Sequence, residues 1–443
     1  MRRYLFGLLS LCAAVASAQT MDLRECVSYA LEHNTSIEQR KLAEENQRVQ
    51  LDNSRSSRLP NLNASMSQGW GFGRSTGRDG TTIDRTSSNT NFSVNTSVPL
   101  FTGFRIPNQI KSDEYSLKAA SENLRQARRN VGVQVATYYL NALYYRGLLE
   151  VQRRQLELDR AALDKAKALY EAGKKPQSEV VSAEAQVALT EHSLTEAIGN
   201  ETLARLDLMQ MLNLEGDVQT FGIVDLEIGD EAARLNSDEA LLDPSAVFDE
   251  AVATYPSILA AQYNLESSRY QLKAARSGYL PTLSFNASYS NGYNYVYDLE
   301  NMKFGKQLDL NGSEYLGLSL NVPIFDRFQT RNSMRQARLN IESQNTALIE
   351  ARQSLNKEIQ QAYWNAQKAR DNYSSAQKAN ASTSLAYQYE TDRYASGKGT
   401  AYDLLLARTR MEKAQQDEVQ AKYEYLMRVK ILEAYLEPEG LIR

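Results

Sequence analysis

The sequence predicts a mainly α-helical fold with membrane β-strands, arranged as two tandem structural repeats. Stretches from the first half of the chain return in the second half at a nearly constant offset. Apolar residues recur every seven positions along two long segments, which is typical of coiled-coil helices. Apolar and small polar residues alternate strictly in short segments, which indicates β-strands with two different faces.

The N-terminus has the features of a secretory signal peptide. Arg2 and Arg3 supply the positive charge, a short apolar run follows, and the small residues A-S-A at 16–18 form a cleavage site. Residues 1–18 are therefore predicted to be removed, and the mature chain to begin at Gln19.

Composition excludes several classes of protein. The formal net charge of −4 argues against a nucleic-acid binder, because such proteins carry a basic face. Cys26 is the only cysteine expected in the mature chain, so no internal disulfide is predicted. Beyond the signal peptide, no stretch approaches the 18 apolar residues that a transmembrane helix requires.

The repeats are traced by matched phrases. ALEHNTSI at 30–37 resembles AVATYPSI at 251–258, and VPLFTGFR at 98–105 returns as VPIFDRFQ at 322–329. Each copy is therefore expected to build the same elements in the same order.

These matches divide the chain into a first repeat at residues 19–221 and a second at 246–443. The overlapping stretch 215–245 has no periodicity and is strongly acidic, with one arginine at Arg234. It is predicted to be an equatorial insert that forms a solvated collar.

Each repeat is expected to hold a helical hairpin. The long helices are predicted at 107–171 and 329–395, and shorter return helices at 177–214 and 400–436, after glycine-containing turns. Two apolar series run along the first long helix: Val135, Ala142, Leu149, Leu156, Leu163 and Tyr170 form one, and Leu117, Leu124, Val131, Tyr138 and Tyr145 the other.

Four strands are predicted from the alternation, at about 60–73, 89–101, 282–297 and 314–325. Their length suits a tilted crossing of a bilayer, with one apolar and one uncharged polar face. The alternative is a soluble sheet with one buried face. The residues predicted to face lipid are Leu62, Trp70, Phe92, Phe285, Leu318 and Leu320.

Four strands cannot close a membrane barrel alone, because an open sheet edge is not tolerated in lipid. Two copies would give eight strands around a filled interior, whereas three copies give twelve strands and room for an aqueous pore. A homotrimer with a 12-stranded barrel is therefore predicted. Pro99 and Pro323 end the second strand of each copy, where a missing hydrogen-bond donor is tolerable, and are predicted to mark the barrel-to-helix transition.

The duplicated order of helix, strand hairpin and long helix resembles the TolC family of outer-membrane factors. The resemblance spans nearly all of the mature chain and rests on LPN and LPT, on VPLF and VPIF, and on Y-x-x-G before each helical turn. It implies a trimer in the outer membrane of a Gram-negative bacterium, with a long periplasmic helical portion. It also implies an exit duct for tripartite efflux or type I secretion, with a periplasmic adaptor (membrane fusion protein) and an inner-membrane transporter of the RND, ABC or a similar class.

The same resemblance implies a periplasmic gate just beyond the helical turns. Asp403 matches the family's gate aspartate, Tyr394 its gate tyrosine, and Glu179 takes the place of an aspartate in the first copy. Leu406 departs from the pattern, where a second gate aspartate would stand. The alternative is that Asp403 and Glu179 only stabilise the first turns of their helices.

The two turns themselves match the family's adaptor-contacting tip. The residues concerned are Gly173, Lys174, Lys175, Gly397, Lys398 and Gly399. The alternative is that these lysines are solvated side chains at helix C-termini, where positive charge is favourable without any partner.

No catalytic constellation is found. His33 and His192 lie apart on helices, without cysteine or acidic companions at ligand spacing, so neither a metal site nor a cofactor is predicted. The protein is therefore predicted not to be an enzyme. The main alternative function is an exported coiled-coil spacer or adhesin without channel activity.

Overall fold

A computed structural model describes residues 19–76, 80–225 and 244–436. The predicted signal peptide and most of the predicted equatorial insert lie outside these residues. The chain forms two compact units. Of the described residues, the strand unit comprises 42–76, 80–122 and 259–350, and the helical unit comprises 19–41, 123–225, 244–258 and 351–436.

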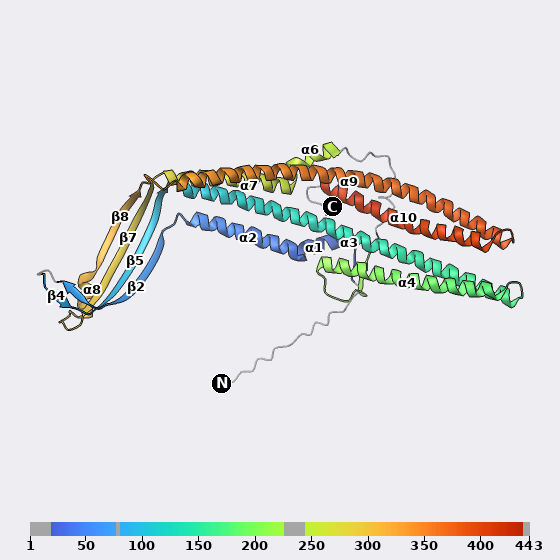
Figure 1. Ribbon diagram of the computed structural model, residues 1–443, viewed down its shortest axis with the longest axis horizontal. Helices are drawn as coiled ribbons and strands as arrows, with labels where there is room; N and C mark the ends of the chain where they lie inside the picture. The colour runs from blue at the N-terminus through green and yellow to red at the C-terminus, as the bar shows by residue number, and fades with distance from the viewer. Residues whose placement is uncertain (1–18, 77–79, 226–243, 437–443) are drawn as a thin grey trace, which may run out of the picture. The chain divides into compact units, whose positions relative to one another are not determined.

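The strand unit contains a four-stranded antiparallel sheet in the order β2-β5-β7-β8 (Figure 1). Its strands are β2 (Asn61–Gly71), β5 (Ser87–Thr102), β7 (Thr282–Val296) and β8 (Ser313–Asn321). The two central strands therefore come from different repeats, while β2 and β8 form open edges. None of the described helices is long and apolar enough to cross a membrane.

Strand register places the predicted lipid-facing residues on one face of this sheet. Met66 lies opposite Phe92, and Phe285 lies opposite Leu318. Leu62 and Leu318 are 74% and 67% exposed in the single chain. The other face carries small polar residues, and the hydroxyls of Ser65 and Ser93 are 2.7 Å apart there. The sheet thus has an uncovered apolar face and a polar face.

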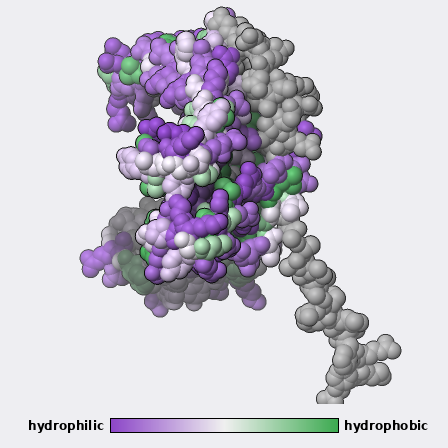
Figure 2. Space-filling model, turned by 90° about the vertical axis from the view of Figure 1, so that its right-hand side faces the viewer, coloured by the Kyte–Doolittle hydropathy of each residue, from purple (hydrophilic) through white to green (hydrophobic). Residues whose placement is uncertain are grey.

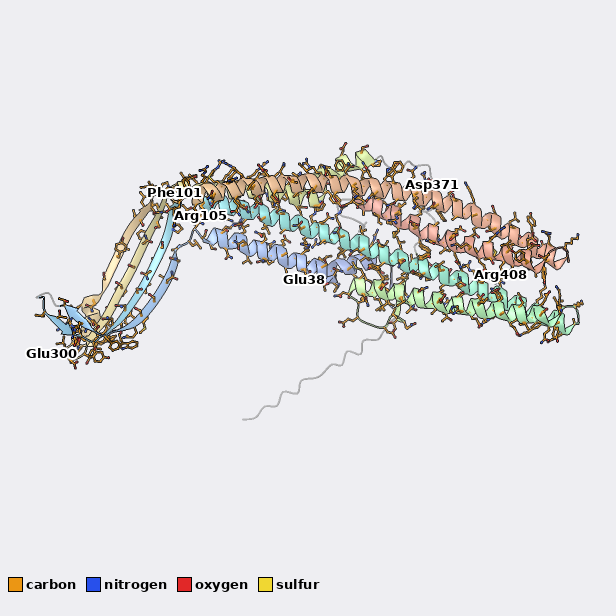
Figure 3. All side chains as sticks on the ribbon, viewed as in Figure 1. Glu38, Phe101, Arg105, Glu300, Asp371 and Arg408 are labelled. Carbon is orange, nitrogen blue, oxygen red and sulfur yellow. The ribbon has the colours of Figure 1, made fainter. Side chains whose placement is uncertain are left out.

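The phrase that the two repeats share forms the junction between strand and long helix. Two consecutive residues are left-handed at each junction: Gly103 and Phe104 in the first copy, Arg327 and Phe328 in the second. At Gly103 a Cβ atom would lie 2.8 Å from the Cβ of Leu280, so glycine is required there. Figure 3 marks this junction by Phe101 and Arg105.

The two prolines differ in position. Pro99 lies within β5 opposite Ser284, and the register shifts between Pro99 and Phe101. Pro323 lies beyond the end of β8 at Asn321, so the prediction of a strand reaching residue 325 is wrong. Proline has no N–H to donate, and in the second copy pairing stops before it, whereas in the first a bulge accommodates it.

Beyond Ser290, β7 pairs with β5 on one side and has no strand on the other, because β8 pairs only up to Ser290. Side-chain amides replace that strand, and we call them the amide ladder. Gln307 accepts from the N–H of Asn294 at 2.9 Å and donates to its carbonyl at 2.9 Å. Asn301 does the same for Val296, at 2.9 and 2.6 Å.

The ladder is completed at Gly292, and all its members belong to the strand unit. The Gly292 carbonyl accepts from Asn311 at 2.7 Å, and its N–H donates to the side chain of Asn291 at 2.8 Å. Gln307 is 6% exposed and lies on helix α8 (Phe304–Asn311). Glu300, in the connection to α8, is labelled in Figure 3. The sequence predicts a loop here, because the alternation ends before α8.

Short strands also occupy the other predicted loop, between β2 and β5. They are β3 (Arg74–Thr76) and β4 (Thr82–Asp84), which pair antiparallel. Arg74 and Asp84 form an exposed ion pair at 3.1 Å across them.

The helical unit is built on two hairpins. Helix α3 (Arg105–Glu171) returns as α4 (Gln177–Leu212), and α9 (Gln329–Ala395) returns as α10 (Ala401–Leu436). The part of each long helix in this unit packs through its heptad positions: Val135 and Ala142 are fully buried, and Leu149 is 6% exposed. Tyr138 is 38% exposed while Tyr139 is buried, because a straight helix drifts from a seven-residue repeat.

The opening helices are each broken once, at equivalent positions of the two repeats. The first copy has α1 (Leu23–His33) and α2 (Thr35–Ser56), separated at Asn34. The second has α6 (Pro244–Thr254) and α7 (Pro256–Arg276), with the 3₁₀ turn Ser277–Tyr279 after it. The helix-forming composition of residues 22–57 and 244–278 predicts one opening helix per copy, and this prediction is wrong because each is broken in two. A proline at the helix start and an asparagine that caps the next turn cause the breaks.

Residues 215–225 of the predicted insert are described. They contain β6 (Phe221–Ile223), which pairs in parallel with β1 (Gln19–Met21). Phe221 and Ile223 are 4% and 6% exposed. This part of the insert is therefore packed on the helical unit rather than solvated.

Candidate functional site

Both hairpin turns are closed by the same backbone motif. Gly173 and Gly397 have φ of 69° and 73°, and the following lysines donate to the carbonyls of Leu169 and Arg393, each at 2.9 Å. These bonds define Schellman motifs, in which glycine terminates the helix. They fix the last helical turn, and with it the tyrosine three residues before each glycine.

Figure 2 shows the face of the molecule that lies at the right of Figure 1, where the hairpin turns are drawn. This face is largely hydrophilic, with scattered hydrophobic side chains between the polar ones.

A polar link joins the two hairpins beside their turns. The hydroxyl of Tyr394, at the end of α9, donates to Oε1 of Glu179 at 2.8 Å. Lys175 donates to the same carboxylate oxygen at 2.9 Å and to the Tyr394 hydroxyl at 3.3 Å. Its ammonium also lies 4.7 Å from the centre of the tyrosine ring, within cation–π range. We call these three residues the tip link.

The tip link shifts the pKa values of its charged members. The hydrogen bond from Lys175, followed by that from Tyr394, holds the pKa of Glu179 below its ordinary 4.5. The hydrogen bonds to Glu179 and then Tyr394 raise the pKa of Lys175 above 10.5. Both side chains are about one-third exposed. The tip link is therefore fully charged at neutral pH.

Asp403 is held differently. It occupies the third position of α10, as Glu179 does in α4, but its carboxylate accepts from the hydroxyl of Thr400 at 2.7 Å. The same hydroxyl accepts from the Asp403 N–H at 3.1 Å. Thr400 and Asp403 thus cap the helix, as the alternative to the gate expects. The structure brings Glu179 and Tyr394 together, and it does not bring Asp403 to them.

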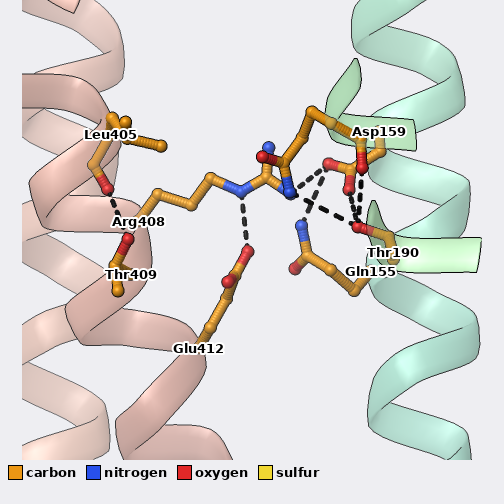
Figure 4. A network of polar contacts seen from close by, with 8 residues as sticks. Gln155, Asp159, Thr190, Leu405, Arg408, Thr409 and Glu412 are labelled. Carbon is orange, nitrogen blue, oxygen red and sulfur yellow. Dashed lines mark hydrogen bonds and ion pairs between the residues drawn. The ribbon is translucent and has the colours of Figure 1, made fainter. Parts of the chain in front are cut away.

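A second connection between the hairpins is buried (Figure 4). Arg408 of α10, 14% exposed, forms an ion pair with Asp159 of α3, which is 2% exposed. Asp159 also accepts from Gln155 at 3.1 Å and from the hydroxyl of Thr190, on α4, at 2.6 Å. The guanidinium donates to Glu412 at 2.6 Å. We call these five residues the buried network, and each charge in it has an opposite partner.

Sequence reasoning missed the buried network and the role of Lys175 in the tip link. A signal was present for Asp159. The second heptad series stops at Tyr145, and its next positions are Gln152 and Asp159. A carboxylate at an inward heptad position requires a buried cation nearby. For Arg408 the sequence offers no comparable signal.

No ligand or metal chemistry accompanies these contacts. Among residues 19–76, 80–225 and 244–436, no group of three or more histidine, cysteine or acidic side chains could hold a metal ion. His33 stacks on Tyr29, and His192 lies 3.6 Å from Glu196 on the helix surface. Cys26 is buried, which raises the pKa of its thiol.

Fold and site together define a class of protein: an exported chain whose strand hairpins, with one apolar face, lead into paired helical hairpins joined at their tips. Residues 26–214 and 247–436 match the model of the family described as outer membrane efflux protein. The chain belongs to this family. The predicted TolC-like family, fold class and outer-membrane location are thereby confirmed.

The relatives are similar over much of their length. The chain is 23% identical to the outer membrane efflux protein BepC of Brucella suis biovar 1, over 74% of this chain and 68% of BepC. It is 25% identical to the outer membrane protein TolC of Escherichia coli K12, over 67% of this chain and 59% of TolC.

Solved structures agree in fold. The open-state structure of the MtrE outer membrane channel of Neisseria gonorrhoeae superposes with a TM-score of 0.73 at 21% identity. The superposition covers 98% of this chain and 94% of MtrE.

Proposed function

We propose that this protein is an exit duct in the outer membrane, serving a tripartite efflux pump or type I secretion system. Family membership supports this function over a spacer or adhesin. The observation that carries the proposal is the sheet, whose apolar face is uncovered and whose edges, β2 and β8, are both open. A surface of this kind is stable in lipid only when neighbouring copies pair with its edges. Three copies supply twelve strands and a water-filled interior.

The polar face then lines the passage, and the helical hairpins continue it into the periplasm. The protein transforms no substrate in this proposal, and an inner-membrane transporter supplies the energy. A periplasmic adaptor contacts the turns, where Lys174 and Lys398 are exposed. Gly173, Lys175, Gly397 and Gly399 belong to the same turns. Pro99 and Pro323 mark where barrel wall gives way to helix.

The tip link is proposed as part of the periplasmic gate. It fastens the second hairpin to the first through side chains that are about one-third exposed, so these hydrogen bonds can break without burying an unpaired charge. Asp403, Tyr394 and Glu179 are the gate residues in this proposal. Lys175 is added to them because its ammonium donates to both Glu179 and the Tyr394 hydroxyl.

A pair of arginine substitutions tests the membrane orientation. Leu318→Arg places charge on the apolar face and should abolish trimer insertion into the outer membrane. Ser319→Arg, the matched control, places the same charge on the polar face and should insert, with altered conductance in planar bilayers. Equal insertion of both variants, judged by membrane fractionation and native gels, would refute the assigned faces.

A further inference from the structure

The internal repeat supplies two tyrosines and two acids near the turns, and the tip link contains one of each. At the offset of the repeat, Tyr394 corresponds to Tyr170 and Glu179 corresponds to Asp403. The second-copy tyrosine and the first-copy acid are joined to each other. Tyr170, by contrast, is 44% exposed. Among the described residues its hydroxyl has no hydrogen-bond partner, and the Asp403 carboxylate meets only Thr400.

The equivalence of the two hairpins in the repeat predicts that the unused pair lies on their outer flanks. The first hairpin presents its acid toward the second, and the second presents its tyrosine toward the first. Each hairpin therefore has an acid flank and a tyrosine flank. In a closed ring of copies, the acid flank of a second hairpin meets the tyrosine flank of the next copy's first hairpin. Asp403 and Tyr170 are the residues at those flanks.

The buried network is likewise formed in only one of the two hairpins. Three residues of the first hairpin surround Arg408, which comes from the second hairpin. They are Gln155, Asp159 and Thr190. Their counterparts in the second hairpin are Ala379, Thr383 and Ala414, which line an open groove between α9 and α10. The position that Arg408 fills from a neighbouring hairpin is thus open in a single chain.

The repeat also predicts which side chain of a neighbouring copy would enter this groove. The counterpart of Arg408 is Glu184 on α4, half exposed and 3.5 Å from Lys167. Arg410, Lys413 and Asp417 line the groove, and Lys413 pairs with Asp417 at 2.7 Å. Arg410 leaves the lining with a net positive charge, which is complementary to the glutamate on α4 of a second copy of this chain.

We propose that Asp403 of one copy accepts a hydrogen bond from Tyr170 of the next copy, and that the groove beside Thr383 receives α4 of that copy around Glu184. The inference rests on the proposed trimeric duct. It makes Asp403 a residue of the seam between copies rather than a free charge facing the passage. The counterpart of Lys175 is Gly399, so the seam lacks the ammonium of the tip link and is the weaker of the two connections.

Crosslinking between engineered cysteines tests the seam. Tyr170→Cys is combined with Asp403→Cys, and the matched pair is Glu179→Cys with Tyr394→Cys. A short bis-maleimide reagent replaces a disulfide, because side chains of this length hold their Cα atoms beyond disulfide range. Cys26 is buried, and the parent protein, which contains it, gives the background level of crosslinking. In native outer membranes the first pair should yield covalent dimers and trimers, and the second only monomers crosslinked internally.

The outcomes separate the seam from the proposed function. Covalent oligomers from the first pair alone support the seam. A trimer on native gels in which the first pair forms no intermolecular crosslink overturns it and leaves the duct intact. Absence of any trimer overturns the duct and the seam together.

A conductance cycle distinguishes the seam from a free acidic ring. Tyr170→Phe removes the donor and Asp403→Ala removes the acceptor, so each should raise single-channel conductance, and the double variant should raise it no further because both remove the same bond. A free ring instead predicts that Tyr170→Phe has no effect and that Asp403→Ala abolishes block by divalent cations. That result would overturn the proposal.

Discussion

The tip link and the buried network join the same two hairpins, but they do so in opposite ways. The tip link lies at the turns and is about one-third exposed. The buried network lies roughly 20 Å further along the helices, and Asp159 in it is 2% exposed. Water can replace a lost partner in the first and cannot in the second.

The two connections explain how one helical bundle can be stable and still open at its tip. A buried ion pair is costly to break, because removing one partner leaves a charge without compensation. A partly exposed link costs little to break, because water solvates both partners once they separate. We therefore expect the hairpins to part at the tip and to stay joined at the buried network.

Removal of Arg408 should have the largest effect. Arg408→Ala leaves the Asp159 carboxylate buried without a cation, which costs about 3–5 kcal/mol. Denaturant unfolding of the detergent-solubilised protein measures the loss. Arg153→Ala, an exposed arginine on α3 without a hydrogen bond or ion pair among the described residues, is the control. Equal midpoints for the two variants would contradict the buried network's role.

Neutralising the acid should be milder. Asp159→Asn keeps the shape and still accepts from Thr190, while Arg408 retains Glu412. The expected loss is about 1–3 kcal/mol, measured in the same unfolding experiment. A loss larger than that of Arg408→Ala would show that Asp159, rather than the pair, carries the stability.

Loss of the tyrosine hydroxyl should affect the gate more than the fold. Tyr394→Phe removes one hydrogen bond to Glu179, worth about 0.5–1.5 kcal/mol, so the unfolding midpoint should change little. Single-channel conductance should rise, because the hairpins are less firmly fastened. Tyr389→Phe, on the same helix and 61% exposed, should conduct as the parent does. An unchanged conductance for Tyr394→Phe would remove the tip link from the gate.

The smallest effect concerns pH. Because the folded-state pKa of Glu179 is lowered, its contribution to closure is present above the ordinary value and is lost as pH falls through the lowered value. Lys175→Gln removes the main cause of that shift. In conductance measurements, channel opening should then begin at a higher pH than in the parent, because the pKa of Glu179 returns toward its ordinary 4.5. Lys398→Gln, at the other turn, should not move the opening pH.

Much of the fold was predictable because the repeat and its periodicities are regular. The two long helices and the β2 and β5 hairpin follow from heptads and alternation, which depend on local sequence alone. The breaks at Asn34 and Tyr255, by contrast, depend on capping and on the residue before Pro256. Helix α8 was missed because Gln307, its buried residue, is polar and carries no hydrophobic period.

The site was predictable only in part, for the same reason. Tyr394 and Glu179 were found through the resemblance to the TolC family, whose gate residues they match by their spacing from the turn glycines. Their direct hydrogen bond was not, since it joins residues far apart in sequence. Lys175 was expected to face an adaptor, and its contact with both gate residues depends on how the hairpins pack.

The amide ladder takes the place of a strand on the side of β7 that faces β8. An incoming strand needs unpaired peptide groups, and along Gly292, Asn294 and Val296 three side chains already occupy that place. Neighbouring copies pair through β2 and β8 in the proposed barrel, so these amides satisfy the stretch of β7 that β8 leaves unpaired. The same amides shield a bare edge from the nascent chains it would otherwise recruit before the ring is complete.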